Sequence, residues 1–331
     1  MLMHTFLPPL LSPRLRVGFY WRKPLGIKNT WSVRWTASIC SSTRWRRVRT
    51  ETTQLQEDSM GLITIDQCNC QRCGFCARAC PVGIIALGEG FPTTGFPTTI
   101  EKIEKGCITC GHCVAACPTG ALSHCRMNAA ECPPLESGWR LTPEQVGQLV
   151  KGRRSIRNFR KEPLKQDVIE QVMDIVRYAP TGMNTQTVSW KVILDEQEVQ
   201  FLALAVIEWL RTLEGEQVHG VKGMLKAWEK GRDPILRKAP ALIIAHGAVD
   251  DPMVSASATI ALANLDLAAL PFGLGTCWAG FLHQAALSSP GVATALGLPP
   301  GHRMYGGVMI GYPEFEYSRI PLRNPAKVTW G

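Results

Sequence analysis

The most constraining feature of the sequence is a cysteine pattern that occurs twice between residues 70 and 118. Each copy has the spacing C-x2-C-x2-C-x3-C-P, and the second copy follows the first at an offset of 37 residues. The first copy comprises Cys70, Cys73, Cys76 and Cys80, and the second comprises Cys107, Cys110, Cys113 and Cys117. Eight cysteines in two copies of this spacing predict two 4Fe-4S clusters.

The reach of the chain predicts which cysteines share a cluster. Three cysteines at intervals of three residues form a short loop around three corners of one cluster. The fourth is followed by a proline, which turns the chain away toward the other cluster. We therefore expect one cluster to be bound by Cys70, Cys73, Cys76 and Cys117, and the other by Cys107, Cys110, Cys113 and Cys80. Residues 60–126 resemble a bacterial two-cluster ferredoxin, a small domain of βαβ type.

Two other interpretations of the cysteines are less favourable. C-x2-C pairs also suit a structural zinc ion. Zinc uses four ligands in two pairs, however, which gives no reason for a doubled run of four cysteines that ends in proline. A disulfide framework is less favourable still, because closely spaced cysteines make poor bridge geometry. The remaining cysteines are unevenly spaced and imply no disulfides: Cys40, Cys68, Cys125, Cys132 and Cys277.

Length and charge limit the classes of function. A chain of 331 residues has room for about two domains. Residues 1–59 carry ten of the 36 Lys and Arg but only three of the 27 Asp and Glu, so most of the net charge of +9 lies there. The rest of the chain is nearly neutral, which does not favour nucleic-acid binding. Two clusters and many free thiols favour a reducing cytoplasm.

The first 59 residues differ from the rest of the chain. The first 50 contain no Asp or Glu and show neither helical nor strand periodicity. We expect a disordered or non-native extension, with the true start at Met60. An Arg- and Ser-rich organellar transit peptide is the alternative, and a basic arm for nucleic acid or lipid is a more distant one.

Residues 127–140, which contain Pro133, Pro134 and Gly138, are expected to form a linker to a second domain over residues 141–331. Helices are expected at residues 142–151, 163–178, 198–213 and 253–270, and strands at 190–194, 241–245 and 307–311. The predicted core face of the second helix consists of Leu164, Val168, Val172, Ile175 and Val176. The last helix is almost wholly apolar, but it contains Asn264 and Asp266, which favours a core or dimer-interface helix over a membrane span.

A cationic run, Arg153-Arg154-Ser155-Ile156-Arg157, follows the first of these helices. Three guanidinium groups and a hydroxyl within five residues suit a phosphate dianion, because arginine makes forked, charge-assisted hydrogen bonds. A solvated basic surface is the equally good alternative for this run alone. No G-x-G-x-x-G follows a predicted strand, so a dinucleotide-binding Rossmann unit is not indicated.

Four segments, taken together, resemble the FMN-dependent nitroreductase family over residues 141–331. They are R-R-S-I-R, then A-P-T-G-M-N-T-Q at 179–186, G-L-G-T-C-W at 273–278, and G-Y-P followed by R-I-P-L-R-N-P near the end. The resemblance implies an α+β fold with a mostly antiparallel central sheet wrapped by helices. It also implies a homodimer with FMN at the interface.

The resemblance further implies roles for particular residues. Arg153, Ser155 and Arg157 would hold the FMN phosphate with help from Arg154, and Arg319 or Arg323 would add a second phosphate cation. Asn184 and Gln186 fall where family members hydrogen-bond the flavin ring, and Gly275 and Thr276 match a loop that approaches the flavin closely. Residues 215–238 occupy the position of a variable lid, and Cys277 is expected to be a small packed residue.

These features predict an oxidoreductase whose chemistry lies on its cofactors, so we assign no catalytic side chain. Electrons from reduced ferredoxin or NAD(P)H would pass through the clusters to FMN and on to a nitroaromatic, a quinone or an activated alkene. The alternative is an electron relay that serves a partner protein and binds no small substrate. A weaker hypothesis treats the ferredoxin-like part as a docking element and its clusters as structural staples. Neither a nucleic acid nor a membrane is an expected partner.

Overall fold

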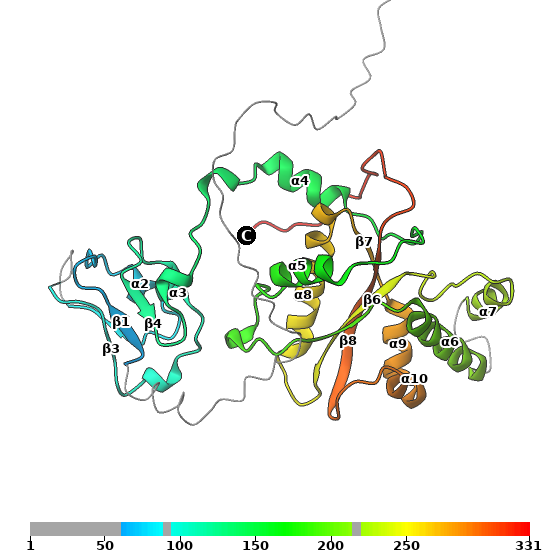
Figure 1. Cartoon of the computed structure of the whole chain (residues 1–331), viewed down its shortest axis with the longest axis horizontal. Helices are drawn as coiled ribbons and strands as arrows, with labels where there is room; N and C mark the ends of the chain where they lie inside the picture. Colours follow the sequence, from blue (N-terminus) through cyan, green and yellow to red (C-terminus); the bar gives the residue numbers. More distant parts are fainter. Residues whose placement is uncertain (1–60, 89–93, 214–219) are drawn as a thin grey trace, which may run out of the picture. The chain divides into compact units, whose positions relative to one another are not determined.

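The structure, a computed structural model, describes residues 61–88, 94–213 and 220–331 (Figure 1). These residues belong to one compact unit of the chain, Leu55–Gly331. The predicted extension over residues 1–59, the predicted start at Met60 and the first residues of the predicted lid lie outside the described residues.

The cysteine-rich part consists of two short β-α-β units. The first contains β1 (Ile63–Ile65), α2 (Phe75–Ala79) and β2 (Ile85–Ala86). The second contains β3 (Thr98–Thr99), the 3-10 turn η1 (Glu104–Gly106), α3 (His112–Ala115) and β4 (Leu122–His124). β1 pairs antiparallel with β4, and β2 pairs antiparallel with β3, so each unit contributes one strand to each ladder. This arrangement is the predicted ferredoxin-like βαβ type.

The two units repeat in backbone conformation as well as in sequence. Gly74 and Gly111, which precede α2 and α3, are left-handed with φ of 71° and 73°. Arg72 and Thr109 are also left-handed, each with φ of 53°. Both pairs are separated by the same 37 residues as the cysteines. The left-handed conformation is costly for Arg and Thr, so its recurrence indicates that the cysteine loops impose one backbone path twice.

Two 3-10 turns and a helix connect the cysteine-rich part to the rest of the chain. The 3-10 turns η2 (Ala129–Glu131) and η3 (Ser137–Trp139) precede α4 (Pro143–Gly152). The hydroxyl of Thr142 accepts a hydrogen bond from the backbone N–H of Gln145 at 3.2 Å, and the Gln145 side chain accepts one from the backbone N–H of Thr142 at 2.8 Å. This capping box fixes the start of α4 where the sequence predicts it.

A four-stranded antiparallel sheet forms the centre of the C-terminal part. Its strands are β5 (Ser189–Ile193), β6 (Ala241–Ala248), β7 (Gly275–Trp278) and β8 (His302–Gly311), in the order β5-β6-β8-β7. The last strand begins five residues before the predicted residue 307, because its N-terminal half pairs with β6 as far as Ala248. The sheet confirms the predicted α+β class.

Helices cover both faces of this sheet (Figure 1). On one face lie α5 (Gln166–Val176) and α8 (Val254–Ala268), and on the other lie α6 (Glu196–Thr212), α7 (Val221–Glu229), α9 (Gly280–Ser288) and α10 (Pro290–Ala295). Successive residues of β6 alternate between the two cores: Ile243 packs with α5 and α8, whereas Leu242 and Ile244 pack with α6 and α9. The 3-10 turns η4 (Gly182–Asn184) and η5 (Leu270–Phe272) complete the described elements.

The buried face of α5 includes Ile169, which the prediction omits, and excludes Ile175, which the prediction includes. Ile169, Val172 and Val176 are buried, as is Leu164 just before the helix, but Ile175 is 51% exposed. The buried residues follow the spacing i, i+3, i+7, and Ile175 lies off that stripe.

The apolar helix at the predicted core position is indeed packed in the core. Val254–Phe272 is long and apolar enough, by length and composition, to cross a membrane. In the structure Ala258, Leu262 and Leu265 of α8 are fully buried against the sheet and α5. Apolar composition therefore reflects burial inside the domain here.

Candidate functional site

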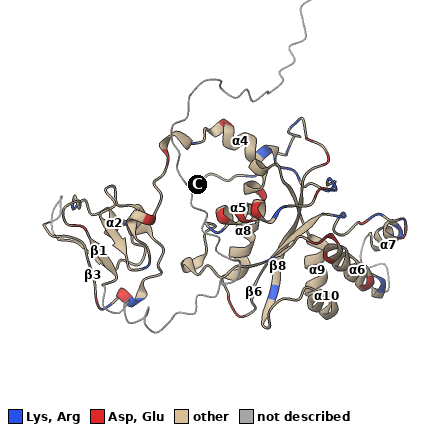
Figure 2. Ribbon diagram, viewed as in Figure 1, with Lys and Arg blue, Asp and Glu red and all other residues tan. Residues whose placement is uncertain are grey.

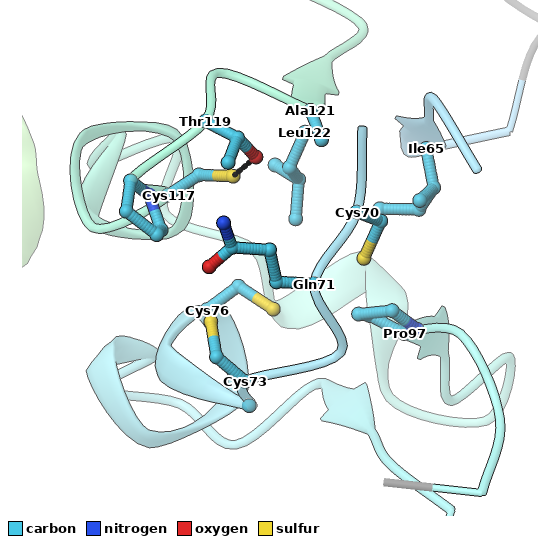
Figure 3. A pocket seen from close by; sticks show the side chains of 12 residues that line it. Ile65, Cys70, Gln71, Cys73, Cys76, Pro97, Cys117, Thr119, Ala121 and Leu122 are labelled. Carbon is cyan, nitrogen blue, oxygen red and sulfur yellow. Dashed lines mark hydrogen bonds between the residues drawn. The ribbon is translucent and has the colours of Figure 1, made fainter. Parts of the chain in front are cut away.

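One cavity in the cysteine-rich part is surrounded by four cysteines, which are drawn in Figure 3. These are Cys70, Cys73, Cys76 and Cys117. Cys70 and Cys73 lie on the loop that leads into α2, Cys76 lies in the first turn of α2, and Cys117 lies after α3, in the second unit. Ile65 and Leu122, which pair across β1 and β4, line the same cavity. This is the grouping expected from the reach of the chain.

A second cavity is surrounded by the other four cysteines of the pattern. These are Cys107, Cys110, Cys113 and Cys80. Ile63 and His124 also line this second cavity. They pair across β1 and β4, two residues along from the pair of Ile65 and Leu122. The two cavities are nearly equal in volume, at about 340 and 350 Å³ when space open to solvent is included.

The chemistry of these cysteines fits a bound iron–sulfur cluster. Burial raises the pKa of the Cys76 thiol to about 11 and also raises the pKa of Cys113. At neutral pH a buried thiol of this kind needs a bound metal to become the thiolate that ligates it. Within the described residues, no three His, Cys, Asp or Glu side chains are arranged to hold a single metal ion. The cysteines are instead spread around two wider cavities.

The predicted phosphate-binding run lies in an extended segment beside β7. Ser155 forms a parallel bridge with Thr276, and the backbone N–H of Ile156 donates to the carbonyl oxygen of Thr276 at 2.8 Å. Successive side chains of an extended segment point to opposite sides. The side chains of Arg153, Ser155 and Arg157 therefore point to one side of this segment. The pairing of Ser155 with Thr276 of β7 determines which side that is.

The arginines of this run line different cavities, whereas the sequence suggests that they form a single group around one phosphate. Arg154 lines a hollow with Ile156, Gly275 and Tyr312. Arg157 lines a separate hollow with Cys277 and other residues. The cause is the alternation of an extended chain, which separates even-numbered from odd-numbered positions. The structure thus keeps Arg153, Ser155 and Arg157 as one set and turns Arg154 away from it.

The side chain of Arg153 is held by a buried carboxylate. Its Nη1 lies 3.1 Å from Oδ2 of Asp266 on α8. The hydroxyl of Thr276 donates a hydrogen bond to the other carboxylate oxygen, Oδ1. Burial raises the pKa of Asp266, whereas Thr276 and Arg153 oppose that rise. A charge buried in an apolar helix requires such partners.

Gly275 and Thr276 belong to a strand, which corrects the expectation of a loop. They form the first half of β7, paired with Gly311 and Ile310 of β8, and both are buried. Gly275 is packed closely: an added Cβ would lie 2.3 Å from Cγ1 of Ile156. Pairing with the long strand β8 overrides the loop character of this glycine-rich run. Their predicted role in flavin binding stays a prediction.

A further arginine, which the sequence pattern does not reveal, lies beside the predicted set. Arg237 and Arg157 both line the hollow that contains Trp278 and Phe281. Their charges oppose the burial that raises the pKa of Cys277, so both guanidinium groups lie near this buried thiol. Cys277 is 5% exposed, in agreement with the expected small packed residue.

The backbone around Arg237 is held in a strained turn. Arg237 and Lys238 are both left-handed, with φ of 59° and 52°. The buried carboxylate of Asp233 accepts hydrogen bonds from the backbone N–H groups of Ile235, Leu236 and Lys238 at 2.8 to 3.0 Å. Consecutive left-handed side chains are uncommon and often accompany functional positions. Asp233, four residues before Arg237, is the one signal in the sequence that points to this turn.

Asn184 and Gln186 lie on a loop with unusual backbone geometry. Both are left-handed, with φ of 54° and 49°. The side-chain Nδ2 of Asn184 donates to the carbonyl oxygens of Ile108 and Thr109 at 3.2 and 3.0 Å. The Gln186 side chain in turn donates to Oδ1 of Asn184 at 3.4 Å. Asn184 therefore contacts a cysteine-bearing loop, and its predicted contact with a flavin ring stays a prediction.

The last two predicted residues lie in the exposed C-terminal segment. Arg319 and Arg323 follow β8 in a stretch without helix or strand. Their suggested role as a second phosphate cation stays a prediction.

Both parts of the chain are similar to known protein families. The model of the nitroreductase family matches residues 150–312, and that of a 4Fe-4S dicluster domain matches residues 69–121. The chain is 32% identical over 134 residues to the iodotyrosine deiodinase of Thermotoga neapolitana. That alignment covers 39% of this chain and 69% of the relative.

Solved structures with a similar C-terminal part include two that contain FMN. One is a nitroreductase from Bacteroides fragilis with bound FMN, which is 22% identical with a TM-score of 0.48 and covers 56% of this chain and 98% of that one. The other is an iodotyrosine deiodinase bound to FMN and 3-iodo-L-tyrosine, which is 22% identical with a TM-score of 0.43 and has the same coverage.

Proposed function

Because the chain belongs to the nitroreductase family and carries a 4Fe-4S dicluster domain, we propose that it is an FMN-dependent oxidoreductase supplied with electrons by two iron–sulfur clusters. The donor is a low-potential one, reduced ferredoxin or NAD(P)H. The acceptor is a small molecule such as a nitroaromatic, a quinone or an activated alkene. The clusters would supply single electrons, and FMN would pass electrons on in pairs. The protein sets the positions of the cofactors and the access of the acceptor to FMN.

The observation that carries this proposal is that one chain holds two four-cysteine cavities together with a nitroreductase-family domain. The hydrogen bonds from Asn184 to Ile108 and Thr109 add support, because they join a loop of the second cavity to the loop predicted to contact the flavin. Electron supply from the clusters to FMN requires such proximity.

The residues available for FMN fit its phosphate. Arg153, Ser155 and Arg157 share one side of an extended segment, and together they offer two guanidinium groups and a hydroxyl to a dianion. Arg237 lies beside Arg157, on the hollow that also contains Trp278 and Phe281, and is not a member of this set. We assign the phosphate to this set, with Arg319 or Arg323 as the candidates for a further cation.

An open, aromatic hollow favours an enzyme over an electron relay. Trp278 and Phe281 are 39% and 46% exposed and line the same hollow as Arg157 and Arg237. A relay would need no such space, whereas a small acceptor needs a pocket with apolar walls and a few polar groups.

We further propose a homodimer and a cytoplasmic location. Figure 2 draws α9 and α10 without Lys, Arg, Asp or Glu, and Phe281 and Leu287 of α9 are exposed apolar side chains. Exposed apolar side chains on uncharged helices suit a subunit interface. The free cysteines of the described residues suit a reducing compartment.

The test uses the full chain, purified without oxygen. Iron, sulfide and flavin are counted per chain, with about eight iron atoms expected for two clusters. The loaded protein is then mixed rapidly with reduced ferredoxin, NADH or NADPH, and reduction of the flavin is followed by absorbance before a nitroaromatic is added. A preparation that contained zinc in place of iron, or that bound no flavin, would overturn the proposal. If the flavin were reduced at an unchanged rate in Cys73→Ser, the result would instead support a purely structural role for the clusters, with no electron transfer through them.

A further inference from the structure

Among the differences between the two cysteine units is one position that bears a histidine in the second unit only. Because the units are offset by 37 residues, Leu87 in the first corresponds to His124 in the second. Leu87 packs close to the first cysteine loop, since a Cβ placed on Gly74 would lie 3.0 Å from its Cδ1. His124 lines the second cavity with Cys107. An apolar side chain at one site thus corresponds to an imidazole at the other.

The hydrogen bonds of His124 determine where its ring carries a proton. The backbone N–H of Arg126 donates to Nδ1 of His124 at 3.0 Å, so Nδ1 is an acceptor. The proton of the neutral ring therefore lies on Nε2. Nε2 is 3.5 Å from Sγ of Cys107, which places an N–H donor against a predicted cluster ligand. His124 is only 5% exposed, so water does not compete freely for this contact.

A hydrogen bond to a ligating sulfur favours the reduced cluster. Reduction adds a negative charge that is spread over the cluster and its thiolates, and a donor at a sulfur stabilises that charge. Leu87 has no donor to offer. We propose that His124 makes the cluster held by Cys107, Cys110, Cys113 and Cys80 the more readily reduced of the two. The change is a one-electron reduction, and His124 keeps its proton throughout.

A competing contact exists at the first cavity, and it is weaker. The hydroxyl of Thr119 lies 3.8 Å from Sγ of Cys117, and either atom can be the donor. Thr119 is exposed, so its hydroxyl also bonds to water. Its counterpart in the first unit is Val82, which has no donor. The shorter, buried contact of His124 is therefore expected to dominate the difference between the clusters.

The experiment measures both reduction potentials in the full-length holoprotein by anaerobic titration, followed by electron paramagnetic resonance. The wild type is expected to show two separate midpoints. His124→Leu copies the first unit, and its higher midpoint should fall by about 59 mV. For a one-electron couple, this shift decreases the ratio of reduced to oxidised cluster about tenfold at a fixed potential. His124→Gln, which retains an N–H donor, should recover part of that shift. Thr119→Val is the matched control and should move neither midpoint by a comparable amount.

A reciprocal variant keeps the proposal testable if His124→Leu loses iron. Leu87→His adds a donor to the first unit and should raise the lower midpoint. Unchanged midpoints in both variants, or a larger shift in Thr119→Val, would overturn the proposal. The inference rests on the proposed function only for the presence of two clusters. The iron count tests those clusters separately, and the titration needs neither flavin nor an acceptor.

Discussion

Nη1 of Arg153 lies 3.1 Å from Oδ2 of Asp266, and this ion pair joins the predicted phosphate-binding run to a core helix. The Asp266 side chain is 8% exposed and that of Arg153 is 25% exposed. Side-chain pairs shielded in this way are screened less than surface pairs. The pair therefore fixes the direction of one guanidinium group at the edge of the proposed FMN site.

Replacing Asp266 with asparagine should weaken binding of FMN but not of riboflavin. Asp266→Asn keeps a group of the same shape that can still accept from Thr276, but it removes the charge that holds Arg153. A freely moving Arg153 should raise the dissociation constant for FMN about tenfold, or about 1.4 kcal/mol. Riboflavin lacks the phosphate and should bind equally well to both proteins.

Flavin fluorescence titrations of the apoprotein measure both affinities. The control is Asp174→Asn, which breaks the exposed ion pair of Asp174 with Arg177. Tighter FMN binding by Asp266→Asn would mean that Asp266 competes with the phosphate for Arg153. An equal loss for FMN and riboflavin would indicate a general packing defect.

Removing the charge of Arg237 should alter the choice of acceptor. Arg237 lines the hollow that also contains Trp278 and Phe281, so it can pair with an acidic group on an aromatic acceptor. Arg237→Gln should lower kcat/KM about tenfold for 4-nitrobenzoate and leave it nearly unchanged for the neutral 4-nitroacetophenone. Arg232→Gln, at an exposed position on the same loop, is the control. A similar decrease for both acceptors would point to a role in flavin binding.

Changing Asn184 to aspartate should loosen the contact with the second cysteine loop. Asn184→Asp replaces the amide N–H donors by carboxylate oxygens, which repel the carbonyl oxygens of Ile108 and Thr109. Aspartate also tolerates the left-handed backbone at this position. Hydrogen exchange of residues 107–111 should become faster, and flavin reduction by reduced ferredoxin should slow.

Met183→Leu alters an exposed side chain of the same loop and removes neither hydrogen bond, so it serves as the matched control. If hydrogen exchange of residues 107–111 is unaltered in Asn184→Asp, the hydrogen bonds of Asn184 do not hold the two loops together.

Stability should fall as the pH is lowered below about 6.5 because of a buried histidine. Nδ1 of His246 lies 2.9 Å from Nδ1 of His302, and this short contact requires one of the two nitrogens to lack a proton. Burial lowers the pKa of His246 below its usual 6.5, with further lowering from His302 and Lys191. Below pH 6.5 the unfolded chain binds a proton that folded His246 does not, so the free energy of unfolding decreases toward the folded pKa.

Thermal unfolding of the anaerobic holoprotein at about pH 7.5 and about pH 5.5 measures this effect. His246→Gln should show a smaller loss of stability between the two conditions than the wild type. An identical loss in the variant would assign the pH dependence to other groups.

Features set by short-range geometry could be predicted from the sequence. The cysteine loops depend on ligand spacing within a few residues, and the start of α4 depends on Thr142, Pro143 and Gln145. The central strand β6 is also predictable, because its run of apolar residues suits burial on both faces.

Features set by long-range pairing could not be predicted. The run at 153–157 looks like one cluster in sequence, but pairing of Ser155 with Thr276 makes it extended and sends Arg154 to the other side. Asp266 was visible as a polar residue in an apolar helix, but nothing local identifies Arg153 as its partner. Arg237 follows no motif, because the turn that presents it depends on the buried carboxylate of Asp233.

The crossed assignment of the cysteines has a consequence for how this protein assembles and fails. Cys80 lines the cavity of the second unit and Cys117 lines that of the first, so each half contributes only three cysteines to its own cavity. An isolated half would leave one iron corner without a protein sulfur. Oxidative loss of either cysteine therefore opens the site in the opposite half, and maturation must load both sites within one intact fold.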